Sequence, residues 1–130
     1  IHDSAIIMGK VTGEGNIILP NVIVEPFSEV ISNNVIYTNS LICHDSIIGS
    51  HNFIAAATVV GGFSKVIESN FIGFNSIIKD NITIGKDVLV GASSLVLKST
   101  EDNSVYFGVP AKKIKEHNDS GIEIKSNILE

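Results

Sequence analysis

The chain has 130 residues and a formal net charge of −5, so one domain with a buried core is expected, and nucleic acid or an anionic membrane is a disfavoured partner. Its single cysteine, Cys43, excludes an internal disulfide framework and fits a reducing compartment, which favours a cytoplasmic location. No run of about 18 apolar residues is present to span a membrane, and no signal peptide is visible.

The chain begins at Ile1 rather than at a methionine and enters a repeat at once. We therefore expect that an upstream segment has been processed away or left out.

From Ile18 to Val96 every sixth residue is isoleucine or valine, fourteen positions in one register, and Ile6 and Thr12 are expected to extend it backwards. A period of six is a multiple of the two-residue repeat of a strand, and it does not fit the 3.6-residue turn of a helix. Branching at Cβ favours strands as well. The pattern predicts short strands throughout this region.

The residues four places after each aliphatic position indicate how many hexads form one coil. Small polar side chains recur there every 18 residues, in one column of asparagines and two of serine and threonine: Asn16, Asn34, Asn52 and Asn70; Ser28, Ser46 and Ser64; Ser40, Thr58, Ser76 and Ser94. Three hexads per coil would stack like on like, ~4.8 Å apart, within hydrogen-bonding reach along the axis. We therefore predict an all-β triangular prism of parallel strands, with about five 18-residue coils over residues 1–98.

Residues 99–130 leave this register and are predicted to form a C-terminal tail that caps one end of the prism, where open strand edges need cover. Gly108, Pro110 and Gly121 are loop signals. The stretch "IEIKSNIL" at 122–129 is predicted to form a short strand.

The phrase His-Asp-Ser occurs at 2–4 and again at 44–46. The two histidines are two coils plus one hexad apart, so they are expected at different corners, and His2, in the first rung, is interpreted as structural or exposed. Gly62 would lie one coil from His44 with its backbone N–H uncovered. His44 would then be a general base, Gly62 an oxyanion donor and Asp45 the group that fixes the imidazole. The alternative is an ordinary surface histidine.

In these features the sequence resembles those of the hexapeptide-repeat acyltransferases, which are left-handed parallel β-helices. Residues 41–116 are similar to the branch that contains sialic acid O-acetyltransferases and bacillosamine-pathway sugar N-acetyltransferases. The resemblance is carried by "HDSIIG" (44–49), "GG" (61–62), "FIGFNSIIKDNITIGKDVLVGASSLV" (71–96) and "GVPAKKI" (108–114). The handedness is implied by the resemblance alone, because parallel crossovers are usually right-handed.

The resemblance implies direct transfer from acetyl-CoA, with His44 as base, Asp45 as its acidic neighbour and Gly62 as oxyanion donor. It also implies a homotrimer with acetyl-CoA in a groove between two subunits, lined by Gly62, Ala92 and the loop of Gly108. Lys112 and Lys113 are expected at the coenzyme A phosphates, with a solvated charge pair as the alternative.

Two departures from the family pattern stand out. Relatives usually have an N-terminal domain that helps to hold a nucleotide sugar, and we expect that domain to be absent from this chain. Many also carry a second histidine nine residues after the base, where this chain has Phe53.

Two other chemistries fit the residues less well. Cys43 as a nucleophile is disfavoured, because adjacent side chains on a strand point apart, and a structural cysteine is preferred. A zinc hydratase of the γ-carbonic anhydrase type would need three histidine ligands. His44 and His51 fall on different corners, so no metal is expected.

The sequence thus predicts an acetyl-CoA-dependent acetyltransferase that acts on the amine of a nucleotide-linked amino sugar. Acetylation of a hydroxyl of sialic acid or another sugar is one alternative. A non-catalytic β-helical scaffold is the other. The acceptor sugar and the length of the acyl donor stay open.

Overall fold

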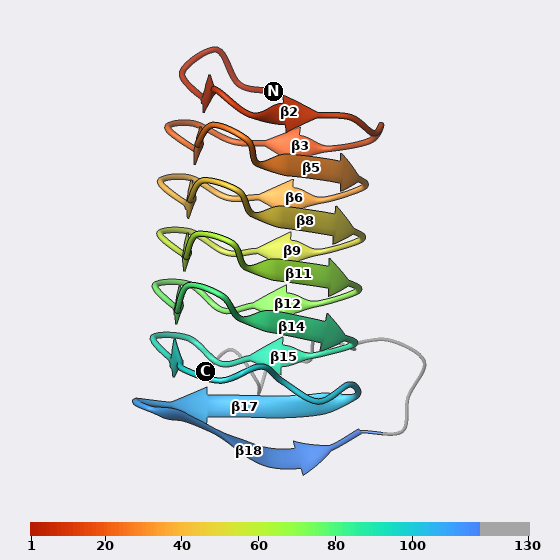
Figure 1. Cartoon of the computed structure of the whole chain (residues 1–130), viewed down its shortest axis with the longest axis vertical. Coiled ribbons are helices and arrows are strands. Elements are labelled where there is room, and N and C mark those ends of the chain that lie inside the picture. The colour runs from red at the N-terminus through yellow and green to blue at the C-terminus, as the bar shows by residue number, and fades with distance from the viewer. Residues whose placement is uncertain (118–130) are drawn as a thin grey trace.

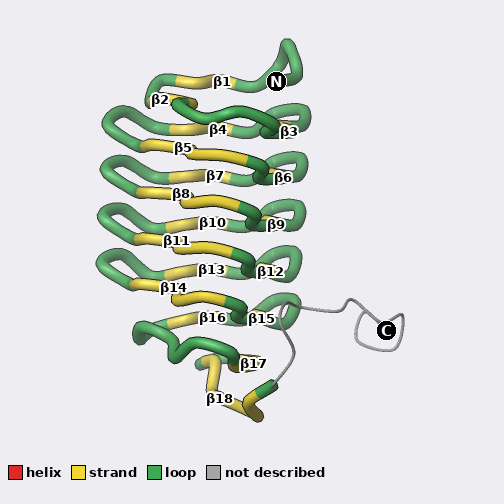
Figure 2. Tube along the Cα trace, turned by 90° about the vertical axis from the view of Figure 1, so that its right-hand side faces the viewer, coloured by secondary structure: helices red, strands yellow, loops and turns green. Residues whose placement is uncertain are grey.

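The computed structural model describes residues 1–117 as a stack of parallel coils, drawn in Figure 1 with the N-terminus at the top of the stack. Each coil passes through three sheets, which we name A, B and C (Figure 2). Sheet A contains β1 (Ile6–Ile7), β4 (Ile23–Val24), β7 (Leu41–Ile42), β10 (Val59–Val60), β13 (Ile77–Ile78) and β16 (Leu95–Val96). Sheet B contains β2 (Lys10–Val11), β5 (Glu29–Ser32), β8 (Ile47–Ser50), β11 (Lys65–Glu68) and β14 (Thr83–Lys86).

Sheet C contains β3 (Ile17–Ile18), β6 (Val35–Ile36), β9 (Phe53–Ile54), β12 (Phe71–Ile72), β15 (Leu89–Val90), β17 (Ser104–Gly108) and β18 (Ala111–Glu116). The predicted all-β parallel architecture is confirmed. Sheet A has six strands, so the prism has about six turns rather than the predicted five. No helix in the described part is long and apolar enough to cross a membrane.

The aliphatic register forms the core of the prism. All fourteen isoleucine and valine positions from Ile18 to Val96 are exposed by 1% or less. Neighbouring coils pair like with like, as Val24 does with Ile42 and Ile42 with Val60. Each buried aliphatic side chain stabilises the fold by ~1.5–3 kcal/mol before chain entropy is counted.

The polar columns hold the coils in register from within, as predicted. The Asn16 Oδ1 accepts the Asn34 N–H at 2.9 Å, and the same bond runs from Asn52 to Asn34 and from Asn70 to Asn52 at 2.9 and 3.1 Å. The ladder ends where the Val88 N–H donates to Asn70 Oδ1 at 2.8 Å. No buried side-chain polar atom in residues 1–117 lacks a partner.

The first coil departs from the predicted register. Ile7 pairs with Val24 and Val11 with Val30, and both pack on the core, whereas the sequence register predicted Ile6 and Thr12 at these places. That prediction was wrong: Ile6 is 53% exposed, and the Thr12 hydroxyl donates to Glu29 on the surface. The corner after β1 is shortened, with the Met8 and Gly9 N–H groups both bonded to the Val24 carbonyl. Only glycine fits there, because a Cβ on Gly9 would lie 2.5 Å from the Ser28 carbonyl oxygen.

The C-terminal tail begins with a hairpin that covers the last edge of sheet C. Strand β17 pairs in parallel with β15, and β18 pairs antiparallel with β17 (Figure 1). The His117 ring then contacts the Asp87 carbonyl at 2.6 Å, which ties the hairpin to the corner of the last coil. The strand predicted at 122–129 lies outside the described residues.

The asparagine ladder generates a stability prediction. Asn70→Ala removes the acceptor of the Val88 N–H and the donor to the Gly85 carbonyl, both inside the prism. We expect the free energy of unfolding in urea to fall by about 2–3 kcal/mol, because buried polar groups lose their partners. Thr12→Ala, which deletes an exposed hydroxyl, is the control and should cost less than about 0.5 kcal/mol. Equal losses in the two variants would contradict a structural role for the ladder.

Candidate active site

His44 and Gly62 stack at the corner between sheets A and B. A Cβ placed on Gly62 would lie 2.7 Å from His44 Cε1 and 2.9 Å from Nε2, so the imidazole covers the glycine directly. Any side chain at position 62 would displace the ring. The stacking of residues 18 apart therefore brings these two predicted site residues together.

Asp45 completes this arrangement. Its backbone has a φ of 58°, a left-handed corner conformation that aspartate tolerates. Its Oδ2 lies 3.0 Å from His44 Nδ1. Because an ionised carboxylate only accepts, a neutral His44 that bonds to it donates its Nδ1–H and keeps its lone pair on Nε2. The ring edge meets Phe63 at a centroid distance of 5.3 Å, which holds the imidazole from the next coil.

Gly62 also offers a donor. Within residues 1–117 its N–H makes no hydrogen bond, whereas its carbonyl accepts the Asn81 N–H at 3.0 Å. The residue itself is buried. Buried backbone N–H groups rarely lack partners, so this one is suited to a ligand oxygen.

Glu25 is a member of this corner that the sequence analysis missed. Its Oε2 accepts the His44 backbone N–H at 2.8 Å, from the coil that precedes the histidine. The repeat predicts that Glu25 lies one coil away from Cys43, because the two residues are 18 apart. The repeat does not predict the side-chain rotamer that turns the carboxylate toward position 44. Burial, and then the Glu25 carboxylate, raise the pKa of the Cys43 thiol. A thiol kept protonated fits the structural role expected for Cys43.

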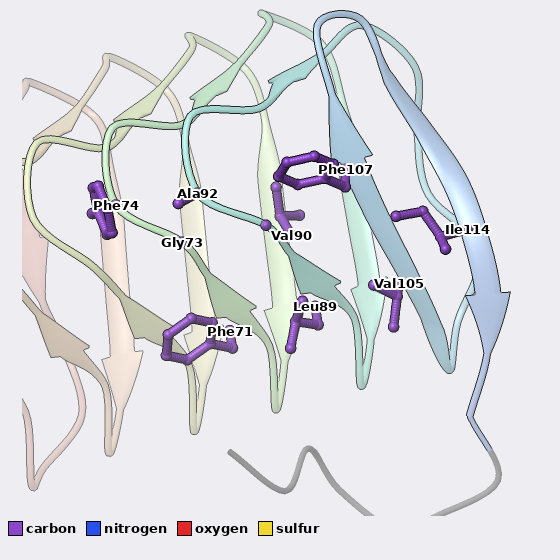
Figure 3. Close-up of a pocket in the computed structure, with 10 residues that line it drawn as sticks. Phe71, Gly73, Phe74, Leu89, Val90, Ala92, Val105, Phe107 and Ile114 are labelled. Atoms are coloured by element: carbon purple, nitrogen blue, oxygen red, sulfur yellow. The ribbon is translucent and has the colours of Figure 1, made fainter. Parts of the chain in front are cut away.

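Ala92 lies at a different corner, between sheets C and A. There a pocket of about 350 Å³ opens beside the C-terminal hairpin, with mostly apolar walls (Figure 3). Its lining comes from the last coils and the hairpin: Phe71, Gly73, Phe74, Leu89, Val90, Gly91, Ala92, Val105, Phe107 and Ile114. Gly108 follows Phe107 on β17 and donates its N–H to Ser94 Oγ at 3.1 Å. One chain therefore does not bring Gly62 and Ala92 together.

The Lys113 ammonium group is paired with two carboxylates. Its Nζ forms ion pairs with Glu101 and with Glu116, the latter at 2.7 Å. Hydrogen bonds to these two groups, Glu101 first, raise the pKa of Lys113 above its usual value. Lys112 is exposed and forms no ion pair with any residue from 1 to 117. Of the two lysines, Lys112 is thus better placed to meet a phosphate.

The other described histidines lie away from this corner. His2 is exposed in the first rung, with Nδ1 2.9 Å from the Ser4 hydroxyl, and His51 is exposed at the corner between sheets B and C. The prediction that His2 and His44 occupy different corners is confirmed.

Phe53 belongs to an aromatic row on the outer face of sheet C. Its ring lies 5.5 Å from that of Tyr37 and 5.1 Å from that of Phe71. In the strands of sheets A and C that precede β18, the outward residue before each core position is apolar: Ile6, Ile23, Leu41, Val59, Ile77 and Leu95 on sheet A, and Ile17, Val35, Phe53, Phe71, Leu89 and Val105 on sheet C. At the same register position, sheet B carries the polar or charged residues Lys10, Glu29, Lys65 and Thr83, with Ile47 as the exception.

The solved structures similar to this chain include acyltransferases. The acetyltransferase domain of PglB from Neisseria gonorrhoeae has a TM-score of 0.83 and 20% identity over 87% of this chain and 56% of that one. PerB from Caulobacter crescentus, in complex with CoA and GDP-perosamine, has a TM-score of 0.68 and 26% identity over 88% of this chain and 56% of that one. A hexapeptide-repeat acetyltransferase from Vibrio cholerae, in complex with acetyl-CoA, has a TM-score of 0.73 and 18% identity over 84% and 72%.

No protein-family model matches the sequence, and no curated protein matches it. The chain spans only about half the length of PglB and PerB as solved. It has the β-solenoid fold of these hexapeptide-repeat acyltransferases.

Proposed function

We propose that the chain is the β-helical part of an acetyl-CoA-dependent sugar acetyltransferase. The observation that carries this proposal is the corner at which His44, Asp45 and Gly62 meet, in a fold shared with acetyltransferases. A fixed imidazole beside an unpaired buried N–H is the pair of groups that acyl transfer requires.

The chemistry follows from the placement of these groups. The acceptor nitrogen attacks the thioester carbon while His44 Nε2 takes its proton. The tetrahedral oxyanion accepts the Gly62 N–H, and the Asp45 carboxylate stabilises the imidazolium that forms. The C–S bond then breaks, and the proton passes from His44 to the departing thiolate of coenzyme A.

Acetyl-CoA is proposed to lie between two copies of the chain. Gly62 on one copy and the apolar pocket at Ala92 on another would then line one groove, together with Gly108 and the basic pair at Lys112 and Lys113. The apolar outer faces of sheets A and C support such an assembly, because contiguous exposed apolar surface marks an interface. A closed ring, a homotrimer, is the expected form.

The proposed acceptor is the amine of a nucleotide-linked amino sugar, with a sugar hydroxyl as the runner-up. The complex of PerB with CoA and GDP-perosamine supports this choice, since PerB shares the coiled fold. A reaction between a nucleotide sugar and acetyl-CoA would take place in the cytoplasm.

His44→Ala tests the base. We expect coenzyme A release, measured with a panel of UDP- and dTDP-linked amino sugars, to fall at least ~100-fold, because general base catalysis contributes about that much. The acetyl-CoA dissociation constant and the melting temperature should stay close to those of the wild type. His51→Ala, an exposed histidine at another corner, is the control. If His44→Ala released coenzyme A at the wild-type rate, His44 would not be the general base.

Acetyl-CoA itself distinguishes an enzyme from a scaffold. A ligand at 100 times its dissociation constant stabilises the protein it binds by about 2.7 kcal/mol, so the melting temperature should rise with acetyl-CoA concentration. Measurement by scanning fluorimetry, with free adenosine as control, is sufficient. A melting temperature independent of acetyl-CoA would favour a scaffold.

Glu25 is expected to act as a positioning residue. Glu25→Ala removes the acceptor of the His44 N–H. We expect the rate of coenzyme A release to fall about tenfold, because one hydrogen bond contributes ~1.4 kcal/mol. The KM for acetyl-CoA should stay unchanged. Glu25→Gln keeps an acceptor oxygen and should restore most of the rate.

The matched control is Glu29→Ala, because Glu29 also accepts a single side-chain bond, from Thr12. Hydrogen exchange at the His44 amide provides a readout that does not depend on activity. An exchange rate equal in Glu25→Ala and wild type would mean that the contact does not hold the corner.

A further inference from the structure

Two exposed phenylalanines bracket the His44–Asp45 corner. Asp45 donates its N–H to the Pro26 carbonyl at 3.2 Å, and Phe63 donates its own to the His44 carbonyl at 3.1 Å. Phe27, Asp45 and Phe63 therefore form one column on successive coils. Phe27 is 84% exposed and Phe63 is 55% exposed.

Both phenylalanines occupy an unfavourable backbone conformation. Their φ angles are 66° and 59°, in the left-handed region that disfavours bulky side chains. Other corner residues of residues 1–117 with positive φ are small or polar: asparagine, aspartate, serine, alanine, histidine and glycine. Asn81, the next residue in the same column, shows what the corner accepts without strain. Neither the exposure nor the conformation of the two rings helps the chain to fold.

The charge of this corner is negative. The carboxylates of Glu25 and Asp45 lie on neighbouring coils beside His44. Asp80, two coils further along the stack than His44, is paired with Lys79 at 3.7 Å. Carboxylates together with aromatic faces attract a cation, since the ring quadrupole presents a negative face. A carboxylate on the sugar ring itself, as in a sugar acid, would be repelled.

We propose that Phe27 and Phe63 form the acceptor subsite and select an amino sugar. The apolar C–H face of the sugar packs on the rings, which are two coils or ~10 Å apart at the backbone, and its ammonium group faces the carboxylates. The inference rests on the proposed function, because it assigns the substrate class of the same site. The edge contact between Phe63 and His44 puts this subsite beside the base.

The proton balance of the reaction accommodates a cationic acceptor. The bound ammonium first releases one proton to solvent. The free amine then attacks the thioester carbon and forms the C–N bond, while His44 takes the second proton. The C–S bond breaks, the thiolate receives that proton, and the product amide keeps the third.

Phe27→Asn and Phe63→Asn test the subsite with whichever UDP- or dTDP-linked amino sugar the wild type acetylates. We expect the KM for the amino sugar to rise at least tenfold, with the KM for acetyl-CoA unchanged. The melting temperature should rise by a few degrees, because asparagine relieves the backbone strain. A variant that merely destabilised the fold would not combine a higher KM for the amino sugar with a higher melting temperature.

Two further variants sharpen the comparison. Phe27→Tyr and Phe63→Tyr keep an aromatic ring and should retain the wild-type KM within about twofold. Asn39→Ala removes a side chain at a left-handed corner between sheets C and A, away from His44, and should leave both KM values unchanged.

Several outcomes would overturn the inference. One is an unchanged amino sugar KM in both asparagine variants. Another is a wild type that prefers a hydroxyl sugar or an acidic sugar, or that acetylates none of the panel although acetyl-CoA raises its melting point. A third is a change of oligomer mass in Phe27→Asn by light scattering, which would mean that a second copy covers this ring. A wild type that neither transfers acetyl groups nor is stabilised by acetyl-CoA would instead refute the proposed function.

Discussion

The stacking of residues 18 apart is the constraint on which every other feature depends. Parallel hydrogen bonds between coils fix each residue over its counterpart, and the buried asparagine ladder fixes the same register from inside. A slip of one residue would turn the aliphatic positions outward and the exposed positions inward. The same register places the imidazole of His44 over the bare Gly62 backbone, so fold and candidate site are specified by one repeat.

Much of this could be predicted from the sequence, because a strict period makes distant residues neighbours. The fourteen core positions, the three polar columns and the contact of His44 with Gly62 all follow from counting in units of 18. The first coil could not be predicted in this way. There Gly9 permits a shortened corner, and a count carried backwards through it aims Ile6 at the core instead of Ile7.

The directions of individual side chains could not be predicted from the sequence either. The repeat places Glu25 one coil before Cys43, but only its rotamer carries the carboxylate to the His44 N–H. Lys113 was expected near phosphates from its position after Pro110. In the structure Lys113 pairs with Glu116, three residues further along β18, and with Glu101 from the loop before β17. Phe27 and Phe63 could have been found from the register alone, since they share a column with Asp45, yet their backbone conformation becomes evident only in three dimensions.

The pocket at Ala92 belongs to the last coils, whereas His44 lies nearer the middle of the stack. Their separation along the axis grows only in increments of one strand spacing, ~4.8 Å. Under the proposed function, the number of coils between His44 and the hairpin therefore sets the distance that acetyl-CoA must span. Insertion or loss of a whole 18-residue unit in that interval would leave the fold intact and still mismatch the reach of the pantetheine arm.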